Sequence, residues 1–403
     1  MDKVYFVKQY NSRTREDFHM KRITQEDIHN TNRQIIYRHI YHGRTVSQKD
    51  IPHALKMSRP TVTAHLSAME NEGLIFRCTP GNSDSQSHSA GRRPITWSVN
   101  SRYKIALGVE ILKDVVKIIA IDLYGLPLKC EVLHEKYENS ERYYEHITVK
   151  VREFIASLEV DDADKKILGI GFALQGLVSE NGDTVIYGEI LKCTGLKIDV
   201  FTKWLDYPCC FVHEPDGAAL SELWVSHELQ DAVYLSMSEH LGGAFISDRR
   251  ILNGQHRHSA TFEHITACEN GELCYCGKRG CYETVCSKVA LLKGEKPEEF
   301  FRRVRSGESK ESERWQNFLR YLGKLIAGLH LFIDTNYILG GHLAPYFTES
   351  DIDTLYEIVR ERTPFAEGKD YILLSKMPSH NITIGAALPY IIKFLDNLPD
   401  VKP

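Results

Sequence analysis

The stretch Cys274-Tyr-Cys276-Gly-Lys-Arg-Gly-Cys281-Tyr-Glu283 decides the fold of this chain. His264 precedes it by ten residues, so three thiols and an imidazole occur in one short segment. Three cysteine sulfurs and one histidine nitrogen form a complete tetrahedral ligand set for zinc. The spacing differs from that of common Cys-x2-Cys sites, and the alternative is a cluster of reduced surface thiols, which are a liability when exposed. Because no position of the tetrahedron stays open, we predict a structural zinc site.

Length and hydropathy set the frame around this segment. The chain has 403 residues, which exceeds one ordinary hydrophobic core, so we expect two or three domains. We find no run of about 18 apolar residues and expect no membrane span. Residues 1–20 carry no apolar signal core, so we expect a cytoplasmic protein. Cytoplasmic thiols stay reduced, and we expect the cysteines outside the cluster, including Cys268 and Cys286, to be ordinary thiols.

The charge of the chain is unevenly distributed. Residues 1–100 contain 15 Lys and Arg against 9 Asp and Glu, a net charge of +6. The whole chain has a formal net charge of −4, so the other 303 residues carry −10. A basic N-terminal segment on an acidic body suggests a module that binds a polyanion, joined to a regulatory module.

Three helices are predicted within the first hundred residues. The first covers residues 32–41 and has the apolar positions Ile35, Ile36 and Ile40. Ser47 is the expected N-cap of the second helix, whose inward-facing residues would be Ile51, Ala54 and Leu55. Ser58 is the expected N-cap of the third, which runs to about Asn71 with Pro60 in its first turn and Val62, Leu66 and Met69 on its apolar face.

Two predicted strands follow these helices and complete a winged helix-turn-helix. Residues 74–77 and 95–99 alternate in polarity, and Gly91-Arg92-Arg93-Pro94 lies between them. Such a domain places its last helix in the major groove of DNA, while basic side chains of the wing contact phosphates or the minor groove. An adaptor domain with an ordinary charged surface is the alternative. The predicted DNA-binding residues are Ser58, Arg59, Thr61, Thr63, His65, Arg92 and Arg93.

From Tyr103 onward, strands alternate with helices, which predicts an α/β body. The expected strands are residues 105–111, 115–122, 167–173, 209–213, 232–237 and 336–341. The expected helices are residues 143–158, 217–227 and 314–332. A strand–hairpin–strand–helix order occurs twice, so we predict two similar lobes with a cleft between them. Residues 1–100 would form the DNA-binding domain. Residues 101–403 would form the body, with lobes near 101–215 plus the C-terminal helix and 216–385.

The cysteine segment resembles the Cys-x-Cys-Gly-x-x-Gly-Cys-x-Glu motif of the ROK family (repressors, open reading frames and kinases). His264 stands where that family places its fourth zinc ligand. Gly91-Arg92-Arg93-Pro94 resembles the wing of the family's repressors, and residues 339–341 and 384–387 resemble its C-terminal elements. The resemblance spans nearly the whole chain. It implies a two-lobed body like that of actin and the sugar kinases, with a ribonuclease H-like fold.

The resemblance also implies that the kinase chemistry of the family is lost. The family's kinases bind ATP with an Asp-x-Gly-Gly-Thr loop, whereas residues 110–114 read Glu-Ile-Leu-Lys-Asp. The second phosphate loop, residues 238–243, keeps only part of its glycine and gains Glu239. The catalytic Asn-Asp pair corresponds to His213-Glu214, where a glutamate is still able to accept a proton. Because three parts of phosphoryl transfer are altered together, we expect no enzymatic activity.

Sugar-binding positions carried over from the family keep their polar character here. They are His213, Glu214, Thr261, His264 and Glu283, of which only two keep the family's residue. A modified carbohydrate pocket is one interpretation. The other is a vestigial cleft in which His264 serves only zinc and Glu283 caps a helix.

These observations favour one function over two others. The favoured one is a DNA-binding repressor of carbohydrate genes that binds double-stranded operator DNA and responds to a sugar or sugar derivative. The alternatives are a DNA-binding regulator controlled by a protein partner and an active sugar kinase with a DNA-binding appendix. A single helix-turn-helix reads a half-site, so we expect a homodimer or homotetramer.

Overall fold

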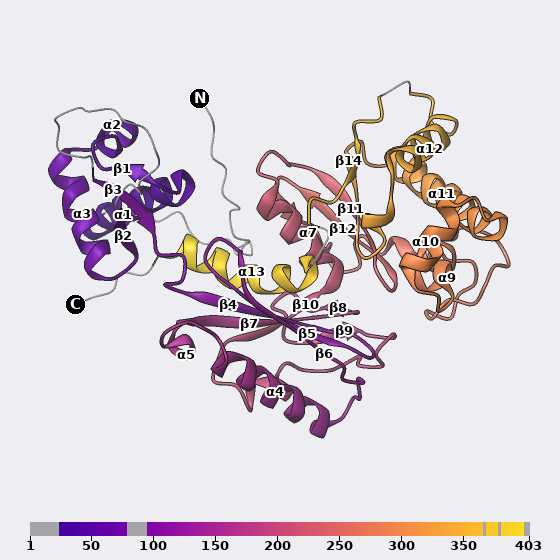
Figure 1. Ribbon diagram of the computed structural model, residues 1–403, viewed down its shortest axis with the longest axis horizontal. Coiled ribbons are helices and arrows are strands. Elements are labelled where there is room, and N and C mark those ends of the chain that lie inside the picture. Colours follow the sequence, from indigo (N-terminus) through magenta and orange to yellow (C-terminus); the bar gives the residue numbers. More distant parts are fainter. Residues whose placement is uncertain (1–23, 79–94, 366–367, 378–379, 399–403) are drawn as a thin grey trace. The chain divides into compact units, whose positions relative to one another are not determined.

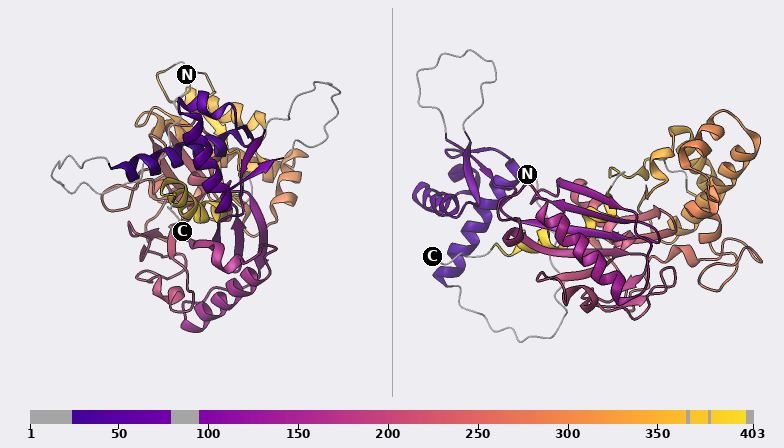
Figure 2. Two further views of the ribbon diagram at one scale, coloured as in Figure 1. Left: turned by 90° about the vertical axis from the view of Figure 1, so that its left-hand side faces the viewer. Right: turned by 60° about the horizontal axis from the view of Figure 1, so that its bottom comes forward.

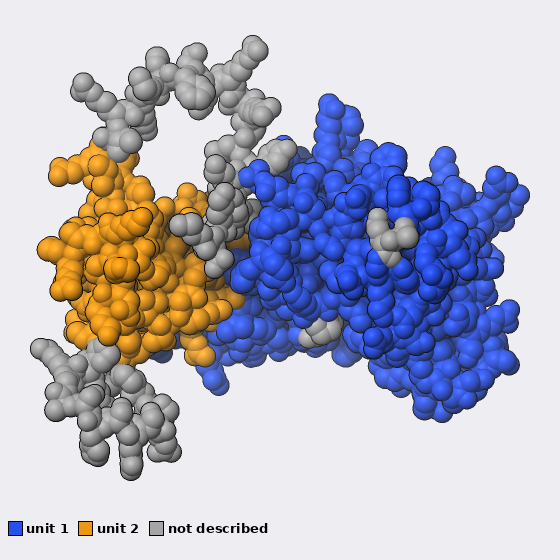
Figure 3. Space-filling view, turned by 90° about the horizontal axis from the view of Figure 1, so that it is seen from above, with its two compact units in different colours: residues 1–7, 106–121, 125–390 blue, residues 8–105, 122–124, 391–403 orange. Residues whose placement is uncertain are grey.

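The computed structural model describes residues 24–78, 95–365, 368–377 and 380–398. The chain divides into two compact units (Figure 3). Unit 1 comprises residues 1–7, 106–121 and 125–390, and unit 2 comprises residues 8–105, 122–124 and 391–403. Unit 2 thus contains the N-terminal helices and also takes in two segments from further along the chain.

Within the described residues, unit 2 contains three complete helices, a small antiparallel sheet and the last turns of a fourth helix. Its elements are α1 (Gln25–Gly43), β1 (Val46–Ser47), α2 (Ile51–Leu55), α3 (Arg59–Asn71), β2 (Ile75–Cys78) and β3 (Thr96–Val99). β3 lies between β1 and β2 in the sheet. This order agrees with the predicted winged helix-turn-helix. Ser58 caps α3 as expected, because its hydroxyl accepts a hydrogen bond from the backbone N–H of Thr61.

Several local expectations for unit 2 were wrong. α1 begins at Gln25, seven residues before the predicted start, because Thr24 and Asp27 form a capping box there. Ser47 does not cap α2; it belongs to β1 and pairs with Thr96 of β3. Ala54 is exposed rather than inward-facing, and Ile35 is 40% exposed.

The C-terminal turns of α13 (Asn381–Asp396) belong to unit 2 and pack within it. Arg38 of α1 forms an ion pair with Asp396 at 3.0 Å. Tyr103 lies with its ring centroid 6.2 Å from that of Phe394. The same unit includes the turn at residues 122–124, where the carbonyl oxygen of Leu123 accepts a hydrogen bond from the Tyr41 hydroxyl at 2.7 Å.

The first sheet of unit 1 has the order β10-β7-β4-β5-β6. Its strands are β4 (Ile105–Ile111), β5 (Val116–Ile121), β6 (Pro127–Leu133), β7 (Ile167–Leu174) and β10 (Cys209–His213). α4 (Glu141–Ala156) and α13 lie on opposite faces of this sheet (Figures 1 and 2). Gly108 and Gly171 allow α13 to approach closely, because a Cβ atom on either would come within 2 Å of an α13 carbonyl oxygen.

The second sheet repeats this arrangement with the order β13-β12-β11-β14-β15. Its strands are β11 (Ala232–Met237), β12 (Leu241–Ser247), β13 (Arg250–Ile251), β14 (Asn336–Gly340) and β15 (Ile372–Leu374). α7 (Glu214–Val225) and α13 cross at Gly217 and Gly385, where a Cβ on Gly385 would meet the Gly217 carbonyl oxygen at 1.8 Å. An apolar core that includes Ala218, Tyr234 and Ala386 surrounds this crossing. The two similar lobes predicted from the sequence are thus present.

A helical layer covers the other face of the second sheet. It consists of α10 (Pro297–Arg305), α11 (Ser309–His330) and α12 (Glu349–Arg360), with Trp315 fully buried at its centre. The remaining short elements are β8 (Leu177–Val178), β9 (Val185–Tyr187), α5 (Ala163–Lys166), α6 (Asp199–Thr202), η1 (Phe262–His264), α8 (Glu283–Cys286), α9 (Lys288–Leu292) and η2 (Ala344–Tyr346). Among the helices of the described ranges, none is long and apolar enough to cross a membrane.

Candidate metal cluster and ligand pocket

The four predicted zinc ligands come together in unit 1. His264 ends the short helix η1, and the three cysteines lie on the loop that leads to α8. One ligand atom from each of His264, Cys274, Cys276 and Cys281 lies within 4.8 Å of the other three. Cys268 and Cys286 are not part of this cluster, as expected.

The spacing of these atoms fits a tetrahedral zinc ion. With Zn–S bonds of about 2.3 Å, two sulfurs of a tetrahedron are about 3.8 Å apart. The Sγ atoms of Cys276 and Cys281 are 3.7 Å apart, and Sγ of Cys274 lies 3.8 Å from Nδ1 of His264. Burial lowers the pKa of His264, which favours the neutral imidazole that a metal binds. The donor set therefore matches the ion that the sequence predicts.

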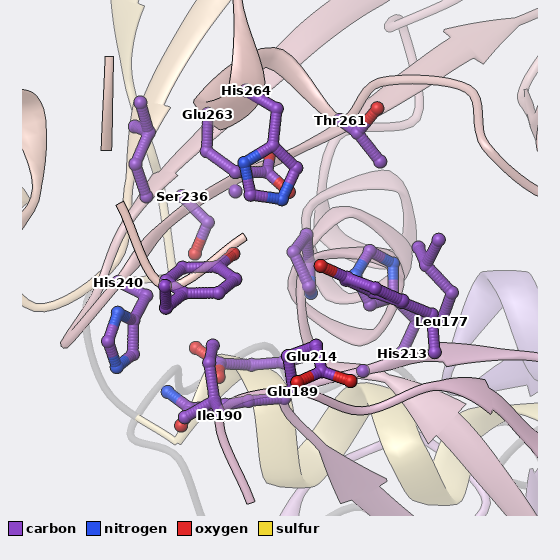
Figure 4. A pocket seen from close by; sticks show the side chains of 17 residues that line it. Leu177, Glu189, Ile190, His213, Glu214, Ser236, His240, Thr261, Glu263 and His264 are labelled. Atoms are coloured by element: carbon purple, nitrogen blue, oxygen red, sulfur yellow. The ribbon is translucent and has the colours of Figure 1, made fainter. Parts of the chain in front are cut away.

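A pocket lies beside the cluster, between the two sheets of unit 1 (Figure 4). Its empty space is about 570 Å³, part of which is open to solvent. His213 and Glu214 approach it from the end of β10 and the start of α7, and His264 and Glu263 approach it from the opposite side (Figure 4). Four of the five predicted sugar-binding residues line it, namely His213, Glu214, Thr261 and His264.

The pKa values of Glu214 and His213 are shifted from their ordinary values in this pocket. Burial raises the pKa of Glu214 to about 7, and the neighbouring Glu110 carboxylate adds to this effect. Burial by itself would lower the pKa of His213, but Asp216 and other nearby carboxylates raise it, and the net shift is upward. Nδ1 of His213 lies 3.4 Å from Oδ1 of Asp216. The pocket thus joins a carboxyl group that resists ionisation with an imidazole that favours its charged form.

Glu283, the fifth predicted sugar-binding residue, does not line the pocket. Its carboxylate contacts Nδ1 of His240 at 2.7 Å and accepts a hydrogen bond from the Leu241 backbone N–H at 2.8 Å. His240 itself lines the pocket. Although burial opposes it, the bond to Glu283 raises the pKa of His240. In this arrangement Glu283 positions His240.

Glu263, His240 and Tyr275 are among the pocket residues that were not predicted from the sequence. Glu263 directly precedes a predicted zinc ligand, and Tyr275 lies between two of these ligands. This proximity in the sequence was the signal that could have identified both residues as part of the pocket. The ring of Tyr275 stands edge-on to His264 and His240, with centroids 5.1 and 5.5 Å away. The metal loop therefore forms one wall of the pocket.

The segments that correspond to the kinase phosphate loops are occupied by other contacts. Glu110 contacts Nζ of Lys117 at 3.2 Å and accepts a hydrogen bond from the Thr383 hydroxyl at 2.9 Å. Leu112 and Val115 close a tight hairpin through a backbone hydrogen bond. Glu239 forms an ion pair with Lys288. The two glycines that remain in the second loop are required for close packing. A Cβ on Gly242 would collide with the side chain of Pro215, and a Cβ on Gly243 would collide with that of Phe262.

The predicted DNA-binding residues have different environments. Ser58, Arg59 and Thr63 are exposed near the start of α3, and Thr61 is half-buried there. His65 was expected on the outer surface, but this is wrong: it is 3% exposed and its ring centroid lies 4.4 Å from that of His29. Arg92 and Arg93 lie outside the described residues.

Comparison with known proteins finds similarity to transcriptional regulators over most of the chain. The xylose repressor of Caldicellulosiruptor bescii is 22% identical over 390 residues, which cover 88% of this chain and 94% of the repressor. The DNA-binding transcriptional dual regulator NagC of Escherichia coli K12 is 25% identical over 347 residues, covering 79% of this chain and 81% of NagC.

Solved structures share the fold. A ROK family transcriptional regulator described as a homologue of the E. coli MLC protein has a TM-score of 0.66 at 19% identity and covers 91% of this chain and 99% of its own. The ROK family glucokinase of Streptomyces griseus, solved with glucose and AMPPNP, has a TM-score of 0.62 at 19% identity and covers 71% of this chain and 98% of its own. The family model described as "ROK family" matches residues 106–388. The chain therefore belongs to the ROK family.

Proposed function

We propose that this protein is a DNA-binding transcriptional regulator of carbohydrate genes whose affinity for operator DNA changes when a sugar binds the pocket of unit 1. The observation that carries the proposal is the similarity to a xylose repressor over 88% of this chain, because it extends beyond residues 106–388, which the family model matches. NagC, also described as DNA-binding, is similar over 79% of this chain.

The start of α3 provides the chemistry for reading DNA. Arg59 and Thr63 are exposed on a helix whose apolar face, including Val62 and Leu66, is buried. An arginine guanidinium donates two hydrogen bonds to a guanine edge, and a threonine methyl contacts thymine. A single α3 reads one half-site, so we expect a dimer or tetramer to bind a palindromic operator.

Arg59→Ala tests the DNA surface. Full-length protein would be incubated with sheared genomic DNA from the source organism, and the enriched site would be titrated by fluorescence anisotropy. We expect Arg59→Ala to weaken specific binding by about 1–3 kcal/mol and to relax base preference at one position. Arg102→Ala, which removes an exposed arginine elsewhere in unit 2, is the control. Unchanged binding by Arg59→Ala, or no enriched site for the native protein, would contradict the proposal.

The metal cluster is proposed as a structural zinc site. Three thiolates and one imidazole close the coordination sphere, and the ligand spacing fits the ion. Bound zinc would fix the loop that carries Tyr275 and the orientation of His264, and both residues line the pocket.

The contacts at the segments that correspond to the kinase phosphate loops favour a protein that binds a sugar over one that phosphorylates it. Glu110 and Glu239 place carboxylates where a nucleotide would bring phosphates, and both carboxylates are already paired with lysines. A coupled assay of ADP release with xylose, glucose and N-acetylglucosamine tests this part. We expect no turnover above background, and sustained ADP release would show that the family's chemistry is retained.

A further inference from the structure

Glu263 lines the pocket, and one oxygen of its carboxyl group has no hydrogen-bond partner. It lies in η1 between Phe262 and His264, and its side chain is 11% exposed. Its Oε2 atom is buried and has no hydrogen-bond partner. Its Oε1 atom lies 3.7 Å from Nε2 of His264, which is longer than a hydrogen bond. Buried polar groups are almost always paired, so this oxygen is suited to a donor that a ligand brings.

The position of this carboxylate also distinguishes the chain from the pattern it resembles. That pattern has its acid three residues before the histidine, at the position of Thr261. Here the Thr261 hydroxyl donates a hydrogen bond to the carbonyl oxygen of His258. The acid stands two residues later, at Glu263, and it still lines the same pocket.

The lining of the pocket is rich in acceptors and poor in fixed positive charge. Glu189, Glu214 and Glu263 contribute carboxyl groups, and none of the described residues that line the pocket is a lysine or an arginine. Lys117 and Lys288, which lie outside the pocket lining, are paired with Glu110 and Glu239. The imidazoles of His213 and His240 contact the carboxylates of Asp216 and Glu283.

An anionic ligand would find no guanidinium or ammonium group among the described lining residues to pair with it. Phosphate and carboxylate groups are usually held by arginine or lysine, or by the backbone amides of a helix N-terminus. At the start of α7 that place is taken by Glu214 itself, which is the first residue of the helix. Hydroxyl and amine groups, in contrast, donate to carboxylates.

We infer that the pocket takes a sugar without an anionic group, neutral or amine-bearing, and that Glu263 accepts a hydrogen bond from that ligand. The inference rests on the proposed function, because it assumes that a sugar is the effector. It excludes sugar phosphates and uronic acids as the preferred ligands of this site.

The first test compares sugars with their phosphates on the native, zinc-loaded, full-length protein by isothermal titration calorimetry. The probes are xylose, and glucose, glucosamine and N-acetylglucosamine each beside its 6-phosphate. We expect at least one parent sugar to bind at least about tenfold more tightly than its phosphate. A phosphate that binds as tightly as its parent overturns the inference but leaves the proposed function intact. If no sugar or sugar phosphate binds, both this inference and the sugar half of the proposed function fail.

The second test assigns the acceptor. Glu263→Gln keeps the side-chain volume and one acceptor oxygen but removes the charge, so we expect the affinity for the best parent sugar to fall about tenfold. Glu269→Gln makes the same change at an exposed carboxylate outside the pocket lining and should leave the affinity unchanged. Zinc content measured on both variants separates a loss of ligand binding from a loss of the metal. Native affinity in zinc-loaded Glu263→Gln overturns the role of Glu263.

Discussion

Glu214 is buried at the point where β10 passes into α7, and its protonation affects stability. Its pKa of about 7 lies above the ordinary value of 4.5, with burial as the main cause and Glu110 as the second. A raised folded-state pKa means that folding favours the protonated carboxyl group. Its contribution to stability is therefore complete below pH 4.5 and is lost as the pH rises from 4.5 to about 7.

We predict that Glu214→Gln stabilises the ligand-free protein at high pH. The amide has no charge to bury, so the melting temperature of the variant should exceed that of the native protein at pH 8, by the equivalent of about 3 kcal/mol, and match it near pH 4.5. Melting curves across this pH range would measure the difference. Glu228→Gln, at a carboxylate exposed to solvent, should show no such pH-dependent gain. A constant difference between Glu214→Gln and the native protein would contradict the assigned pKa.

Gly280 and Gly277 provide a matched pair in the metal loop. Both have positive φ angles, 73° and 83°. A Cβ on Gly280 would lie 1.8 Å from the carbonyl oxygen of Cys268, whereas a Cβ on Gly277 would meet nothing within 4 Å. Gly280→Ala should therefore cost more than about 2 kcal/mol and reduce zinc content, while Gly277→Ala should cost about 1 kcal/mol from backbone strain alone. Equal melting temperatures and zinc contents in the two variants would refute the packing of this loop.

At the scale of the element, α3 depends on its N-cap. The Ser58 hydroxyl accepts from the Thr61 backbone N–H at 3.2 Å, satisfying a donor that the helix leaves free. Ser58→Ala should lower the stability of unit 2 by about 1 kcal/mol, measured as the opening free energy of the α3 backbone amides by hydrogen exchange. Ser67→Ala, at an exposed position inside α3, should be neutral or slightly stabilising, because alanine is the better helix former. A larger loss for Ser67→Ala than for Ser58→Ala would exclude the capping role.

Elements with strong local signals could be predicted from the sequence. β4, β10 and β11 have the predicted bounds. Each is a continuous apolar run that ends at a turn, so the sequence marks where the strand begins and ends. The prediction that Ser47 caps a helix was wrong because its strand partner, Thr96, lies 49 residues away. Pairing between strands leaves no pattern in the residues next to Ser47. The burial of His65 was predictable, since it lies three residues after Val62 on the same helical face.

The pocket could be predicted only in part. Positions carried over from the family identified His213, Glu214, Thr261 and His264, all of which line it. The same approach passed over Glu263 and His240, because the family pattern has no acid or imidazole assigned to those positions. Glu283 contacts His240 because the second lobe brings two loops together. The spacing of these residues along the chain does not reveal that contact.

At the scale of the whole molecule, the metal cluster and the pocket form one structure in unit 1. We predict that removing zinc with a strong chelator lowers both the melting temperature and the affinity for the bound sugar, because the loop with Tyr275 and the imidazole of His264 lose their anchor. Calorimetry before and after chelation, with zinc added back, would measure both effects. Cys276→Ser should reproduce the chelated state, and full sugar affinity without metal would show that the pocket does not depend on the cluster.

His264 belongs to the metal cluster through Nδ1 and to the pocket lining through its ring. Thermodynamic reciprocity then applies: whatever factor zinc adds to the affinity for sugar, sugar must add to the affinity for zinc. A regulator of this kind would hold its metal most firmly while its effector is abundant. When zinc is scarce, the protein would lose its zinc most readily after the effector is exhausted. Its response would therefore depend on the supply of zinc and of carbohydrate together.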